Sequence, residues 1–93
     1  MENARIVRFL RCGASDVIDL AIEKAGLTYR EALAVKFVGR LGMSQSAAAE
    51  YIEAQHLIES CSVDSMHLWH KSAMQKLSRA WDGCWWIGIM ADY

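Results

Sequence analysis

Residues 62–77 read SVDSMHLWHKSAMQKL, and this stretch decides the fold that the sequence predicts. Apolar or small residues recur in it every three or four positions, and one histidine completes the series: Val63, Met66, His70, Ala73 and Leu77. This spacing places the five side chains on one face of an α-helix. The stretch is therefore expected to be a helix packed on a core, and its outward side chains bear on its function.

The rest of the chain has the same helical spacing and no proline among its 93 residues. The alternation of apolar and polar residues that is typical of strands is missing. Hydrophobic residues make up 54% of the chain and charged residues 23%, which is typical of a folded globular protein. We therefore expect an all-α fold, with residues 1–93 forming a single small bundle of four or five helices.

Capping residues and glycines indicate where these helices begin and end. The first helix is expected to end near Gly13, and the second runs from the N-cap Ser15 to Gly26. Thr28 and Glu31 stand three apart as a capping box that begins a third helix.

The second half of the chain is divided in the same way. The third helix is expected to end at Gly42, and an alanine-rich fourth helix, capped by Ser44, covers residues 44–60. After a short break at residues 60–62 the fifth helix continues to Gly83, which stands where a C-terminal glycine would.

Net charge and cysteine content restrict the environment that we expect. The formal net charge is −1, so the chain as a whole has no electrostatic attraction to nucleic acid or membrane. Three scattered cysteines do not form a disulfide framework, which favours a reducing compartment. No signal peptide and no membrane-spanning stretch is visible, so we expect a soluble cytoplasmic protein and no membrane partner.

Residues 84–93, CWWIGIMADY, form an apolar tail rich in tryptophan. Such a tail either folds back over the helices or packs against another chain, most simply a second copy in a dimer. Tryptophan is enriched at the energetic centres of protein interfaces. The residues expected to contact a protein partner are Trp69, Trp85, Trp86, Ile87 and Ile89.

A family resemblance appears over residues 27–80. It rests on Leu27, Thr28, Arg30, Glu31, the connection of residues 41–44, Ala49, Glu50, Ser62, Val63, Ser65, Met66, Ala73, Lys76 and Leu77. This order resembles the helix-turn-helix domain with which bacterial sigma factors read promoters, and it is similar to the DNA-binding domain of two-component response regulators. The resemblance implies a helix-turn-helix-like core whose final helix lies in the major groove of DNA.

The resemblance also implies which residues contact DNA. Ser62 and Ser65 match hydroxyls that contact phosphate, and Val63, Met66, Ala73 and Leu77 match buried positions. The DNA-binding residues expected in and beside the last helix are Ser62, Ser65, His67, Leu68, Lys71, Ser72, Lys76 and Arg79. Arg5, Arg8 and Arg11, spaced by three, form either a solvated face or a second group of phosphate contacts.

Two hypotheses for function follow. The first is a small transcription-related protein that binds DNA or the transcription machinery. The second is a protein-interaction or oligomerisation module on a scaffold that has lost DNA binding. Three features favour the second. The segment between Glu50 and Ser62 is too long for a tight turn, residues 42–69 include four carboxylates and neither lysine nor arginine, and the N-terminal half of the last helix lacks the arginine, asparagine and glutamine that make two-point base contacts. The two groups of basic residues, in the first and last helices, favour the first hypothesis.

Catalysis is not expected, because the chain lacks a nucleophile elbow, a P-loop and an HExxH motif. Asp16 and Asp19 are interpreted as charges that complement a helix dipole. His67 and the cysteines do not match a zinc-binding spacing. No cofactor and no metal are therefore expected.

Overall fold

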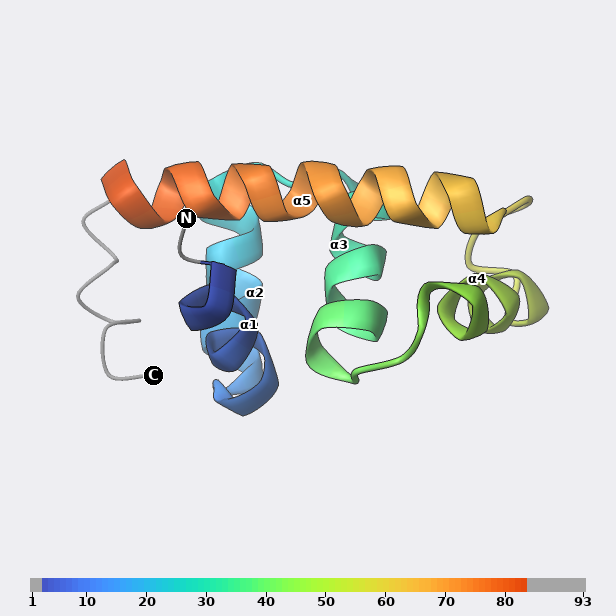
Figure 1. Ribbon diagram of the computed structural model, residues 1–93, viewed down its shortest axis with the longest axis horizontal. Coiled ribbons are helices and arrows are strands. Elements are labelled where there is room, and N and C mark those ends of the chain that lie inside the picture. Colours follow the sequence, from blue (N-terminus) through green and yellow to red (C-terminus); the bar gives the residue numbers. More distant parts are fainter. Residues whose placement is uncertain (1–2, 84–93) are drawn as a thin grey trace.

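The computed structural model of the protein describes residues 3–83 (Figure 1). These residues form helices α1 (Asn3–Cys12), α2 (Ser15–Ala25), α3 (Tyr29–Ala34), the π-helix η1 (Val35–Arg40), α4 (Gln45–Ala54) and α5 (Val63–Gly83). The described part of the chain contains no strand, so the predicted all-α fold is confirmed. None of its helices combines the length and hydropathy of a membrane span.

Helix α5 is the longest of the described helices, and the others all lie on one side of it (Figure 1). Its C-terminal half covers a cluster of buried side chains from α1 and α2, among them Phe9, Leu10 and Ile18. Its N-terminal half covers a second cluster, from α3, α4 and the segment after α4, which includes Ile52 and Met66. The apolar stripe of residues 62–77 predicted a helix packed on a core, and the structure shows that this helix closes both halves of the core.

Local signals set most of the helix boundaries. The capping box at the start of α3 is confirmed: Thr28 Oγ1 accepts from the Glu31 backbone N–H at 3.2 Å, and Glu31 Oε1 accepts from the Thr28 N–H at 2.9 Å. Gly26 and Gly42 follow α2 and η1 with φ angles of 72° and 73°. Glycine has no Cβ to clash in this left-handed region, which explains why both helices end there.

The predicted N-cap of α2 is wrong. Ala14 is the N-cap, in an extended conformation, and Ser15 is the first residue of the helix. Alanine has no side-chain acceptor, so no side-chain hydrogen bond caps this end; Asp16 Oδ1 accepts from the neighbouring Val17 N–H at 3.0 Å. The start of α2 is thus shifted by one residue relative to the prediction.

The prediction that the fourth helix continues to residue 60 is also wrong, because α4 ends at Ala54. His56 adopts a left-handed conformation with a φ of 57°. The Leu57 N–H donates to the Ile52 carbonyl and the His56 N–H to the Glu53 carbonyl, both at 3.1 Å. This pattern is a Schellman motif, in which histidine takes the place usually held by glycine.

Residues 55–62 therefore form an eight-residue connection between α4 and α5. Ile58 and Cys61 point inward and are buried in the second core cluster. Glu53 Oε2 accepts from the Cys61 backbone N–H at 3.2 Å. The connection is packed against the core by these contacts, although it is longer than the tight turn of a helix-turn-helix.

Helices α1 and η1 pack closely at a glycine, and an arginine from each helix donates hydrogen bonds to backbone carbonyls at the end of the other. A Cβ on Gly39 would lie 2.9 Å from Cδ1 of Leu10, so only glycine allows this approach without displacement. Arg40 Nη1 donates to the carbonyls of Leu10 and Gly13 at 3.2 and 2.8 Å. In return, Arg11 Nε donates to the Gly39 carbonyl at 3.0 Å. Each arginine satisfies carbonyls that the other helix leaves open at its C-terminal end.

Candidate nucleic-acid interface

The other described helices lie on one side of α5 and leave its outer face uncovered by them (Figure 1). Four exposed residues follow one another along it at spacings of three and four: Leu68, Lys71, Gln75 and Arg79. We call these four residues the α5 crest. At 3.6 residues per turn they lie opposite the buried stripe of Met66, Ala73 and Leu77.

The charge along this face is uneven. Asp64 lies in the first turn of α5, and no carboxylate follows it between residues 65 and 79. Lys71 and Arg79 are both exposed on the crest, with Gln75 between them. One flank adds His67 and Ser78, which border an open hollow of about 810 Å³ together with crest residues. The crest is therefore rich in hydrogen-bond donors and carries two positive charges.

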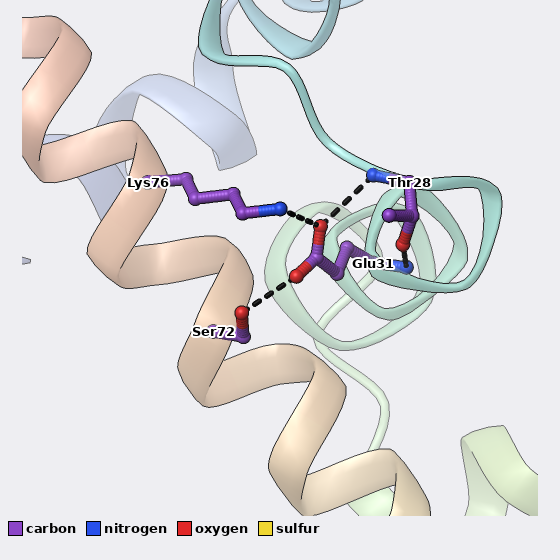
Figure 2. A network of polar contacts seen from close by, with 4 residues as sticks. All are labelled: Thr28, Glu31, Ser72 and Lys76. Carbon is purple, nitrogen blue, oxygen red and sulfur yellow. Dashed lines mark hydrogen bonds and ion pairs between the residues drawn. The ribbon is translucent and has the colours of Figure 1, made fainter.

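The opposite flank of α5 is held by a buried carboxylate. Glu31 is only 6% exposed, and Figure 2 shows its side chain between α3 and α5. Lys76 Nζ lies 2.8 Å from Oε1, and Ser72 Oγ donates to Oε2 at 2.6 Å. Together with the Thr28 N–H, these groups give the carboxylate three donors. Glu31 thereby joins the start of α3 to the middle of α5.

These contacts lower the pKa of Glu31. Burial alone would raise the pKa, because it removes water from the charged form. The hydrogen bonds from Lys76, Ser72 and Thr28, with the charge of Lys76, outweigh burial and lower the pKa from 4.5 to about 2. Glu31 is therefore ionised at neutral pH, and the polar atoms of Lys76 and Ser72 bind its carboxylate.

This arrangement changes two of the predicted DNA contacts. Lys76 and Ser72 were expected to face DNA, and the structure instead places their polar atoms on Glu31. Their spacing of four along α5 was a signal that they share one flank. Glu31 lies 41 and 45 residues away in sequence, and only the folded arrangement of α3 on α5 identifies it as their partner.

The serines at the start of α5 form its N-terminal cap. Ser62 Oγ accepts from the Ser65 backbone N–H at 3.1 Å and donates to Ser65 Oγ at 3.0 Å. Ser62 is exposed, so the predicted phosphate contact of these hydroxyls stays a prediction. Val63 was expected in the buried stripe, and that prediction is wrong: it is 46% exposed, because it stands in the first turn, at the edge of the core.

The structure describes the side chains of two of the three N-terminal arginines, Arg8 and Arg11. Arg11 stands in the last turn of α1. Arg11 is anchored on the Gly39 carbonyl, and Arg8 is exposed. The side chain of Arg5 lies outside the described part of the structure. Of the three basic residues on α5 itself, Lys71 and Arg79 are exposed on the crest and Lys76 pairs with Glu31.

Trp69 is half-buried and packs on the second core cluster. The guanidinium of Arg30 lies 5.8 Å from the centre of the Trp69 ring, within the range of a cation–π contact. Arg30 is exposed, and it adds a positive charge beside α5 that our list of DNA-binding residues omitted. The other predicted partner contacts, Trp85, Trp86, Ile87 and Ile89, lie outside the described residues.

The histidines of α5 do not form a metal site with their neighbours. His70 is half-buried, and burial, with a smaller effect of His67, lowers its pKa, so the neutral form is favoured. Within residues 3–83, no group of three or more His, Cys, Asp or Glu side chains could hold a metal ion.

The candidate interface is thus a crest of one apolar residue, two cations and one amide on the face of α5 that the other described helices do not cover. Its second flank is held to α3 by Glu31. The chain was compared with protein-family models, curated proteins and solved structures, and no match was found.

Proposed function

We propose that this chain is a non-catalytic DNA-binding protein that places the α5 crest in the major groove. One observation carries the proposal: residues 3–83 leave the outer face of α5 uncovered, and α5 presents Lys71, Gln75 and Arg79 there without a carboxylate between residues 65 and 79. Major-groove readers commonly insert one helix whose exposed side chains meet base edges and phosphates. The succession of α3 with η1, α4 and α5 supports the proposal, since it follows the helix order that the resemblance implies.

In the proposed mechanism the α5 crest contacts DNA, and the residues around the crest add a phosphate contact and hold α5 in place. Lys71 and Arg79 neutralise phosphates and approach base edges, and release of counterions supplies much of the affinity. Arg30 contributes a further phosphate contact beside α5. The tie between Glu31, Ser72 and Lys76 holds α5 against α3, so the crest does not have to be ordered when DNA binds.

The proposal is tested by fluorescence anisotropy of a labelled DNA duplex, measured between roughly 50 and 200 mM salt. The affinity of the natural sequence is expected to fall steeply as salt rises. In the variant Lys71→Gln/Arg79→Gln, the slope of log K against log salt becomes shallower by about 2, because each lost phosphate contact contributes about 0.9.

The matched control is Arg8→Gln/Lys36→Gln, which also removes one arginine and one lysine, both exposed, from α1 and η1. This control keeps the affinity and slope of the natural sequence if the α5 crest is the interface. Equal losses in both variants would show attraction by net charge alone. Affinity that does not change with salt would refute the proposed mechanism.

Protein interaction is the second candidate function, and it is favoured by the exposure of Leu68, which is 63% accessible on the crest. An exposed leucine among polar residues also suits an apolar contact with a partner helix. Leu68→Gln separates the two functions. It leaves the salt slope of DNA binding unchanged, but it would lower the molecular mass in solution if the crest held two copies together.

A further inference from the structure

The α5 crest has the length and spacing of a base-reading element. From Leu68 to Arg79 the helix rises about 16 Å, at 1.5 Å per residue, and base pairs stack about 3.4 Å apart. The crest therefore spans about five base pairs, and recognition helices usually present three or four side chains to base edges. All four crest residues are exposed, so none has to leave the core to reach DNA.

Gln75 occupies the centre of this crest. It lies opposite the buried Ala73 and Leu77 and between the cations Lys71 and Arg79, each four residues away. A glutamine amide both donates and accepts, so it can pair with N6 and N7 of adenine through two hydrogen bonds. Lysine and arginine only donate, and they pair with O6 and N7 of guanine. Gln75 is thus the crest residue whose hydrogen-bonding pattern is matched to adenine.

The surroundings of Gln75 restrict how α5 turns about its own axis. One flank is fixed by Ser72 and Lys76, whose polar atoms lie 2.6 and 2.8 Å from the Glu31 carboxylate. Beneath the crest, Ala73 is completely buried and Met74 nearly so. A helix held in this way fixes the position from which the Gln75 side chain extends outward, and two-point hydrogen bonding is favoured by such a fixed backbone position.

We propose that Gln75 is the specificity-determining residue of the DNA-binding face, selecting adenine at one position of a short site. This inference rests on the proposed function. It also places base reading in the middle of α5, with Lys71 and Arg79 at neighbouring positions of the site.

The inference is tested by selection from a library of random duplexes with the full chain, followed by sequencing of the bound pool. We expect a short enriched motif that contains an adenine. For Gln75→Ala the same motif is expected, except that the preference for adenine at that position falls about 10-fold. A loss of this size is within the discrimination that a base contact through two hydrogen bonds usually provides. Gln55→Ala, an exposed change of the same kind at the end of α4, leaves the motif intact.

The possible results separate the inference from the function on which it rests. A chain that shows no salt-dependent DNA binding overturns both. Salt-dependent binding with a bound pool that stays random overturns the inference and leaves the proposed function standing. An enriched motif that Gln75→Ala does not change also overturns the inference, and so does equal loss of the adenine preference in Gln55→Ala.

Discussion

Glu31 is the residue that joins the start of α3 to the middle of α5. It completes the capping box of α3 and also accepts hydrogen bonds from Ser72 and Lys76 of α5. A carboxylate in this position is costly to bury unless its partners are present. Its contribution to stability therefore depends on Lys76.

We expect Lys76→Met to lower the free energy of unfolding by about 3 kcal/mol at pH 7, because it leaves a buried carboxylate without its cation. The matched control, Lys36→Met, removes a lysine that pairs with Asp19 at 3.5 Å with both side chains about half exposed. That variant should lose less than about 1 kcal/mol. Urea denaturation followed by circular dichroism measures both. Equal losses would contradict the account of Glu31.

The pKa of Glu31 predicts how this contribution varies with pH. The folded-state pKa of about 2 lies below the ordinary value of 4.5, so ionisation favours the folded state above pH 4.5. This stabilisation, about 3 kcal/mol, is lost as the pH falls from 4.5 towards 2. In Lys76→Met the acid-induced loss is smaller. An equal acid-induced loss in both proteins would assign it to other carboxylates.

At this scale the sequence predicted one half of the role of Glu31. Thr28 and Glu31 stand three apart, and such a local pair shows in sequence because both groups lie in one helical turn. The contacts with Ser72 and Lys76 join residues more than 40 positions apart. Their position depends on how α3 packs on α5, and no local pattern carries that information.

At the scale of elements, the end of α4 shows what sequence patterns miss. The alanine-rich stretch continues beyond Ala54 with residues that a helix accepts, and no glycine marks an end. The helix nevertheless ends, because Ile58 and Cys61 are buried in the core when the chain turns at His56. Burial of these two side chains offsets the conformational cost of a left-handed histidine.

His56→Gly is expected to stabilise the protein by about 1 kcal/mol, since glycine adopts a φ of 57° without the clash that a Cβ causes. His56 is exposed, so little packing is lost. The change would raise the melting temperature by roughly 4–8 °C for a domain of this size. As a control, Gln55→Gly at a negative φ of −89° should destabilise. A lower melting temperature for His56→Gly would show that α4 does not end in this conformation.

At the scale of the whole molecule, the predicted all-α fold is confirmed, and the structure shows that the long amphipathic helix α5 packs on both halves of the core. The stripe of Met66, Ala73 and Leu77 was readable because helical periodicity reports the buried face directly. The basic surface was harder to predict. Charged side chains of one sign look alike in sequence, whether they pair internally, as Lys76 does, or lie exposed, as Lys71 does.

The central claim, that the α5 crest binds DNA, is tested most directly by nuclear magnetic resonance. A short duplex is added to the isotope-labelled protein at low salt, and the backbone amide signals are followed. We predict progressive shifts centred on Leu68, Lys71, Gln75 and Arg79, with smaller shifts near Arg30. Shifts confined to α1 around Arg8, or no shifts at a DNA concentration well above that of the protein, would contradict the claim.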